Sequence, residues 1–146
     1  MLPKAPLAAA AVAAMLSAST ANASPAEDYM LYCMGCHGAE ARGVPGKIPP
    51  LAGSLALFMR TPEGRNYVVR VPGAANSALS DAQLSAVLNW IAERYGASDG
   101  GPAPAAFTPA EVTRTRHLPL VSVQATRREL VRALAAAGGT APPTDY

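Results

Sequence analysis

The chain has 146 residues, and its 12 Lys and Arg against 10 Asp and Glu give a formal net charge of +2 at pH 7. That length suits one domain, and the near balance of charge argues against binding to nucleic acid and against a strongly charged docking partner. Half of the residues are hydrophobic but only 5% are aromatic, so the side chains alone would build a thin core.

Residues 1–23 are typical of a secretory signal peptide. A positively charged start at Met1 to Lys4 precedes an apolar run over residues 7–16, and Ala21-Asn22-Ala23 offers small residues for cleavage. The apolar run is shorter than the ~20 residues that cross a bilayer, although an uncleaved membrane anchor stays an alternative. We therefore expect a mature chain that begins at Ser24, does not span the membrane and resides in the bacterial periplasm.

A helix and a cofactor motif begin the mature chain. Ser24-Pro25-Ala26-Glu27 is a capping box with proline at the first helical position, which predicts a helix from here to about Cys33. The next residues, Cys33-Met34-Gly35-Cys36-His37, form the attachment signature of a c-type haem. Thiols three residues apart share one face of a helical turn and can reach both vinyl groups of one porphyrin, while His37 can ligate the iron.

A Cys-x-x-Cys pair has other uses, namely a dithiol redox site, a structural disulfide or half of a zinc site. Beyond the motif, His117 is the one further Cys or His in the chain, so a zinc site lacks ligands. A dithiol oxidoreductase needs the pair at the start of a helix that follows a buried strand, whereas a helical pattern precedes Cys33. We keep it as a remote alternative to one covalent haem c.

Residues 38–50 contain three glycines and three prolines and predict a loop. Pro49, twelve residues after His37, opens the sequence Pro49-Pro50-Leu51-Ala52-Gly53. With the haem motif, these residues resemble the class I cytochromes c. In that family a proline at this offset turns its carbonyl to the second nitrogen of the proximal histidine, and a leucine two residues later packs on the haem. The resemblance gives Pro49 and Leu51 these roles, although the two prolines also serve to stiffen a turn.

The elements after the loop are expected in the following order: a short helix over 51–60, a turn over 63–66 and, further on, a loop over 71–78. Residues 67–71 fit a helical turn or an extended piece, and the resemblance to the class I cytochromes c favours a short helix there. Ser80-Asp81-Ala82-Gln83 is a second capping box, and apolar residues follow at three- and four-residue spacing as far as Tyr95. This is the best-defined helix. The resemblance, which covers residues 24–97, makes it the family's last helix, packed across the first, and implies an all-α fold of short helices around one covalent haem.

A helical extension is expected beyond this haem domain. Residues 98–107 are rich in Gly, Pro and Ala and predict a linker before residues 108–146. Thr108-Pro109-Ala110-Glu111, a third capping box, predicts a helix that ends before Pro119, and a second helix is expected from Ser122 to Ala137. Two short helices cannot bury a core alone, so we expect the extension to strap onto the haem domain rather than to bind a partner. Its five arginines are expected to face solvent.

The sixth iron ligand is the open point of the sequence. Electron-transferring members of the family carry a methionine in the loop before the last helix, often followed by proline, but here that dipeptide is Val71-Pro72. Met59 is the candidate ligand and His117 a weaker one, because the other methionines lie in the signal or beside the haem motif: Met1, Met15, Met30 and Met34. The remaining alternative is an iron that is five-coordinate or water-bound.

Two functions follow from that choice. The first is a monomeric periplasmic carrier of single electrons between redox proteins, without catalytic activity. The second is a c-type haem domain with an open distal site for gas binding, sensing or peroxide chemistry. Polar side chains for the second are Arg60, Arg65 and Tyr67, but arginines there equally suit haem propionates or an ordinary charged surface.

Overall fold

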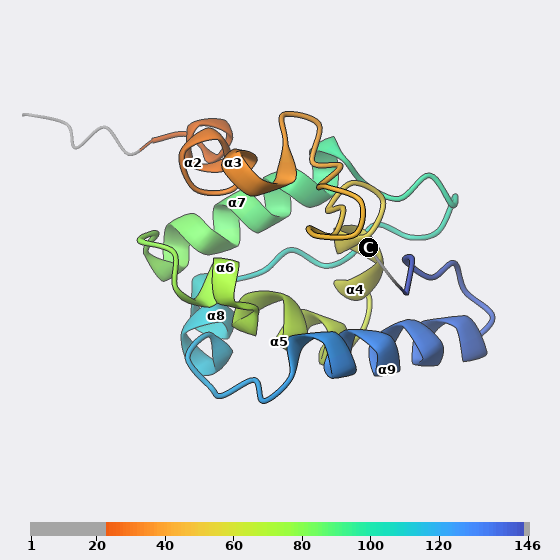
Figure 1. Cartoon of the computed structure of the whole chain (residues 1–146). Coiled ribbons are helices and arrows are strands. Elements are labelled where there is room, and N and C mark those ends of the chain that lie inside the picture. Colours follow the sequence, from red (N-terminus) through yellow and green to blue (C-terminus); the bar gives the residue numbers. More distant parts are fainter. Residues whose placement is uncertain (1–22, 145–146) are drawn as a thin grey trace, which may run out of the picture.

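The computed structural model describes residues 23–144, and that part of the chain folds into eight helices without a β-strand (Figure 1). The predicted all-α fold is therefore confirmed. The predicted signal peptide lies outside the described residues except for Ala23. The helices are α2 (Pro25–Tyr32), α3 (Met34–His37), α4 (Leu55–Phe58), α5 (Pro62–Arg70), α6 (Pro72–Ala75), α7 (Asp81–Arg94), α8 (Pro109–Thr115) and α9 (Val123–Ala136).

Helices α2 and α7 pack against each other, and both begin at the predicted capping boxes (Figure 1). In α2, the Ser24 hydroxyl accepts from the Glu27 N–H, and the Glu27 carboxylate accepts from the Ser24 N–H. Between the helices, the buried ring of Tyr29 lies 5.6 Å from the Trp90 ring and 6.0 Å from the Tyr95 ring, measured between centroids. The prediction that the aromatic helix packs across the first one is confirmed.

The segment between residues 51 and 78 is more helical than predicted, and its boundaries differ. Helix α5 already begins at Pro62, with the Thr61 hydroxyl accepting from the Gly64 N–H, so the predicted turn over 63–66 was wrong. Gly64 is there for close packing: a Cβ at this residue would lie 2.1 Å from the Phe58 carbonyl oxygen. A proline at the first position also starts the single turn α6, where a loop was expected.

Helix α4 is shorter than the predicted helix over residues 51–60. Gly53 has a φ of +69°, outside the helical range, and its N–H donates to the Tyr95 carbonyl at the end of α7. The helix therefore starts only at Leu55 and ends at Phe58.

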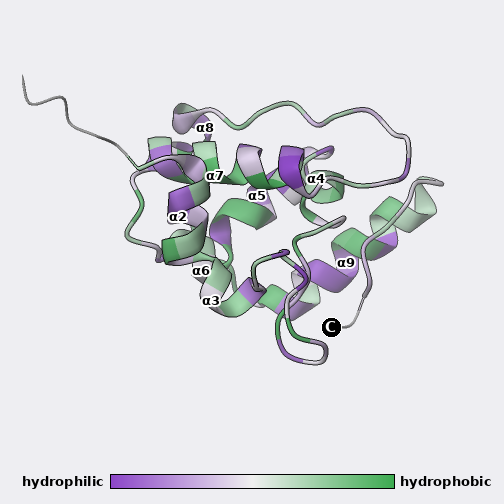
Figure 2. Cartoon of the chain, turned by 90° about the horizontal axis from the view of Figure 1, so that it is seen from above, coloured by the Kyte–Doolittle hydropathy of each residue, from purple (hydrophilic) through white to green (hydrophobic). Residues whose placement is uncertain are grey.

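The C-terminal extension packs on the rest of the fold. Helix α8 contacts α7 and α5, and α9 runs beside α5 (Figure 1). The linker is helix-free, as predicted, and its end is fixed where the Asn89 amide and the Phe107 backbone exchange hydrogen bonds of 2.7 and 3.0 Å. Figure 2 shows hydrophilic and hydrophobic residues alternating along α9, which fits a helix with one face on the domain.

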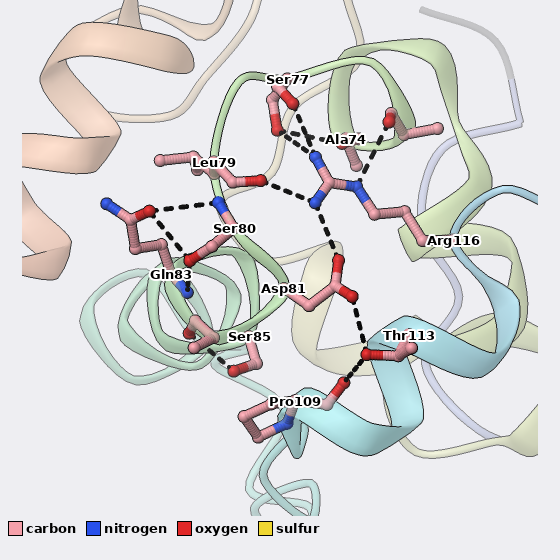
Figure 3. A network of polar contacts seen from close by, with 12 residues as sticks. Ala74, Ser77, Leu79, Ser80, Asp81, Gln83, Ser85, Pro109, Thr113 and Arg116 are labelled. Carbon is pink, nitrogen blue, oxygen red and sulfur yellow. Dashed lines mark hydrogen bonds and ion pairs between the residues drawn. The ribbon is translucent and has the colours of Figure 1, made fainter.

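The arginines of the extension are not all solvated, contrary to expectation. Arg116 is 4% exposed and Arg127 3% exposed. Figure 3 shows how the Arg116 guanidinium donates to the Asp81 carboxylate and to backbone carbonyls at the end of α6 and in the segment that follows it. These carbonyls belong to Ala75, Ser77 and Leu79. The extension therefore holds the segment that leads into α7 at several points.

Among residues 23–144, no helix combines the length and the apolar character needed to cross a membrane.

Candidate functional site

The two cysteines lie on one turn of helix. Cys33 ends α2, and its carbonyl accepts from the N–H groups of Cys36 and His37 at 3.2 and 3.0 Å, which makes α3 a single turn. Both thiols are free; Cys33 is half-buried and Cys36 is exposed. The bond from the Cys36 N–H to the Cys33 carbonyl places the two cysteines one turn apart. That both sulfurs face one porphyrin stays a prediction.

The environment of Cys33 does not favour a thiolate. Burial of its thiol, with added repulsion from Asp28 and Cys36, raises the pKa of Cys33 to about 11. Redox-active cysteines in dithiol oxidoreductases instead have lowered pKa values. The segment that leads into the pair is helix α2 rather than a strand. Neither feature resembles a dithiol redox site.

His37 is half-buried at the end of α3, and its ring Nδ1 lies 3.0 Å from the carbonyl oxygen of Pro49. A carbonyl only accepts, so Nδ1 carries the proton and Nε2 keeps its lone pair. Burial lowers the pKa of His37, while the contact with Pro49 acts in the opposite direction. The result is a neutral imidazole with a fixed tautomer, which is the form that ligates a metal.

Two tyrosines hold the start of the loop after His37. The Tyr29 hydroxyl donates to the Gly38 carbonyl at 2.6 Å, and the Tyr95 hydroxyl donates to the Ala39 carbonyl at 2.8 Å. Since Tyr29 lies on α2 and Tyr95 caps α7, the paired helices position the loop that carries Pro49.

The end of the same loop is fixed by backbone contacts. Pro49 and Leu51 are both half-buried, and the N–H groups of Leu51 and Ala52 donate to the carbonyl of Ala41 at 2.8 and 2.9 Å. Leu51 packs against the hydrophobic core, as does Cys33. The structure thus brings the predicted residues Cys33, Cys36, His37, Pro49 and Leu51 into one region of the fold.

Sequence reasoning did not single out Gly43, although the structure places it at this site. Its N–H donates to the His37 carbonyl at 2.8 Å, and its φ is +69°. A Cβ there would lie 2.6 Å from the Pro49 oxygen. Nothing in the sequence separates this glycine from Gly38 and Gly46 in the same loop, because the difference depends on where the chain returns.

Met59 is the one candidate for the distal side that is fully buried. It caps α4, is 2% exposed and belongs to the main hydrophobic cluster. His117 follows α8 and is exposed. These two predicted candidates are therefore in different environments, a packed core for Met59 and solvent for His117.

Arg60 and Arg65 are occupied by carboxylates of this chain. Arg60 donates to both oxygens of Asp99 at 2.6 and 3.0 Å, and Arg65 to both oxygens of Glu111 at 2.6 and 2.7 Å. The alternative of an ordinary solvated surface is wrong for both, because the linker and the extension supply carboxylate partners for them. Binding to haem propionates stays a prediction. Tyr67 is buried, with its ring centroid 5.5 Å from that of Phe58.

Comparison with known proteins supplies the family. No family model matches the chain. Two curated proteins named Cytochrome c-552, both from Thermus thermophilus, are 32% identical to it over 102 aligned residues. The alignment takes in 58% of this chain and 78% and 69% of the two relatives. The chain belongs to the class I c-type cytochromes.

Membership in the c-type cytochromes implies an electron-transfer protein with redox proteins as partners and a covalently bound haem c. The residues present fit that group. Two free thiols lie on one turn beside an imidazole whose second nitrogen is already bonded. All three belong to elements that pack on the hydrophobic core of this cytochrome.

Proposed function

We propose that the chain is a periplasmic carrier of single electrons with one haem c, attached through Cys33 and Cys36, with His37 as the proximal iron ligand. The observation that carries the proposal is the 3.0 Å contact between His37 Nδ1 and the Pro49 oxygen beside two free thiols. A metal-ligating histidine needs its other nitrogen bonded to fix the tautomer and the ring orientation. When bound, the haem supplies reversible one-electron chemistry at iron.

The protein's own contribution is a fixed proximal side. The Pro49 carbonyl accepts a hydrogen bond from His37 Nδ1–H, which would make Nε2 a stronger donor to iron. Leu51 adds apolar packing next to this contact. Tyr29 and Tyr95 tie the start of the loop that leads to Pro49 to helices α2 and α7.

For the sixth ligand we propose Met59. Of the three methionines among residues 23–144, Met30 is half exposed on α2 and Met34 lies between the two cysteines, which leaves Met59 as the buried one. A thioether ligand raises the reduction potential of a haem, as an electron carrier with high-potential partners requires.

A second candidate function is a haem domain with an open distal position, acting in gas binding, sensing or peroxide chemistry. The observation in its favour is the segment before α7. Residues 71–80 contain no Met, His, Cys or Lys, so this segment offers no iron ligand. In addition, Arg116 fixes carbonyls of Ala75, Ser77 and Leu79, so the segment is held in place.

The location and the assembly state belong to the same proposal. The signal peptide directs export, cleavage leaves Ser24 as the first residue, and the mature chain works as a monomer. Balanced charge supports protein redox partners over nucleic acid.

Visible spectroscopy of the protein matured in a bacterial periplasm tests the proposal. Haem should stay with the wild-type chain after acid–acetone extraction and should be extracted from the variant with Cys33→Ala and Cys36→Ala. Extraction from the wild-type chain would reject the attachment.

The same spectra separate the two candidates for the distal side. Met59→Leu should abolish the weak far-red band of a ferric haem with a thioether ligand and lower the midpoint potential, whereas Met30→Leu should change neither. An unchanged spectrum for Met59→Leu, with carbon monoxide bound readily by the wild-type protein, would favour the open site.

A further inference from the structure

Gly43 lies where the loop after the haem motif passes against the residues that hold His37. Its N–H donates to the His37 carbonyl, 2.8 Å away. A Cβ added to Gly43 would lie 2.3 Å from the Ile48 carbonyl oxygen and 2.6 Å from the Pro49 carbonyl oxygen. Gly43 is therefore bonded to the residue that carries the imidazole and is in contact with the carbonyl that accepts from it.

The contacts of Gly43 leave the Pro49 carbonyl little room to move. The two atoms that a Cβ at residue 43 would meet, the carbonyl oxygens of Ile48 and Pro49, belong to the backbone and cannot rotate away as a side chain would. Val44 and Ile48 exchange backbone hydrogen bonds of 2.9 and 2.8 Å, which closes the turn between Gly43 and Pro49. A side chain at residue 43 must then displace Pro49, and the 3.0 Å contact with His37 weakens quickly with distance and angle.

We infer that Gly43 is a positioning residue for the imidazole of His37, an inference that rests on the proposed role of His37 as iron ligand. Its missing side chain lets the Pro49 carbonyl approach Nδ1 closely. The bonded Nδ1 proton makes Nε2 more basic and stabilises the ferric state, which lowers the midpoint potential. Gly43 would thus influence the strength of an iron–histidine bond through the Pro49 carbonyl.

A purely conformational role for the glycine predicts something different. Gly46 in the same loop has a φ of +76°, close to the +69° of Gly43, but a Cβ at Gly46 would meet nothing within 4 Å. Alanine at either residue suffers the strain of a left-handed backbone. Alanine at Gly43 alone also collides with the carbonyl groups of Ile48 and Pro49, so a comparison of the two substitutions isolates the effect of these collisions.

The experiment compares Gly43→Ala and Gly46→Ala with the wild-type holoprotein. Covalent haem is measured first, because its absence from the wild-type protein would reject the proposed function and not the role of Gly43. The midpoint potential and the solvent exchange rate of the His37 ring N–H, observed by NMR in the reduced protein, follow. We expect a raised potential and about tenfold faster exchange for Gly43→Ala, with wild-type values for Gly46→Ala. Equal behaviour of the two variants would overturn the inference.

A less strained variant covers the case in which Gly43→Ala does not mature. Asparagine tolerates a left-handed backbone better than alanine and still carries a Cβ, so Gly43→Asn should show the same raised potential and faster exchange. Loss of the holoprotein for both Gly43 variants, with normal yield of Gly46→Ala, would show a folding role only and would also overturn the inference.

Discussion

The guanidinium of Arg65 binds both carboxylate oxygens of Glu111, 46 residues further along the chain, at 2.6 and 2.7 Å. Arg65 lies on α5 and Glu111 on α8, so the pair joins the cytochrome fold to its C-terminal extension. The same guanidinium donates to the carbonyls of Met59, Ala105 and Ala106 and lies 4.2 Å from the Phe107 ring centroid. One side chain therefore connects α4, α5, the linker and α8.

Arg65→Ala should destabilise the protein by about 3 kcal/mol, because it leaves the partly buried Glu111 carboxylate and several carbonyls without a donor. Urea unfolding followed by tryptophan fluorescence measures the loss. The control is Arg42→Ala, since Arg42 pairs with Glu40 on an exposed surface and should change stability by less than ~0.5 kcal/mol. Equal effects of the two substitutions would contradict the account of the extension.

Arg116→Ala should cost about 3–5 kcal/mol, because the side chain is buried and its donors satisfy Asp81 and three carbonyls. Arg116→Lys should recover only part of this, since an ammonium cannot reproduce the fork of a guanidinium. Hydrogen exchange of the amides in residues 75–80 should rise in both variants. The control is Arg114→Ala, which removes an exposed arginine of the same helix. An equal rise in amide exchange of residues 75–80 in this variant would contradict the proposed role of Arg116.

Stability should fall in acid because the carboxylates that hold the extension have lowered pKa values. Arg65 lowers the pKa of Glu111, Arg60 lowers that of Asp99 to about 2, and Thr113 followed by Arg116 lowers that of Asp81. Their contribution is complete above the unfolded-state pKa of about 4 and is lost as the pH falls toward the folded values. Urea midpoints at pH 6 and pH 3 should differ less for Glu111→Gln than for the wild type. A difference unchanged by the substitution would count against these pairs.

Tyr29→Phe and Tyr95→Phe should each lower stability by about 1 kcal/mol, because each removes a hydroxyl that donates to the loop after His37. Burial raises the pKa of Tyr29 to about 12. Its contribution is therefore complete below about pH 10 and is lost as the pH rises toward the folded value. Tyr29→Phe should flatten this alkaline decline, and Tyr32→Phe, at an exposed residue, should not. A similar alkaline decline in the wild type, Tyr29→Phe and Tyr32→Phe would argue against the hydrogen bond assigned to the Tyr29 hydroxyl.

Local signals were enough to predict most of the helices. The predicted hydroxyl caps at Ser24, Ser80 and Thr108 all accept the expected N–H, and the glycines and prolines of residues 38–50 do form a loop. Glu111 departs from the predicted capping box: its carboxylate turns to Arg65 instead of to the start of its own helix. That choice depends on a partner far away in the sequence.

The features that could not be predicted depend on long-range packing. In the sequence, Gly64 is typical of a turn. In the structure it lies inside α5, where the Phe58 carbonyl approaches so closely that a side chain would not fit. From the sequence, Arg116 is expected at the surface. In the folded chain it is buried because carbonyls at the end of α6 and after it accept its hydrogen bonds. The attachment motif is local and could be recognised from five residues, whereas the distal ligand depends on which side chain the fold brings to the far side of the iron.

The most direct test of the account is the intact mass of the denatured protein after export to a bacterial periplasm. A covalent haem survives denaturation, so the expected mass is that of the chain from Ser24 plus one haem. The variant with Cys33→Ala and Cys36→Ala should have the mass of the chain alone. A wild-type chain that has lost its signal peptide and carries no haem mass, under conditions in which a known c-type cytochrome matures, would contradict the account.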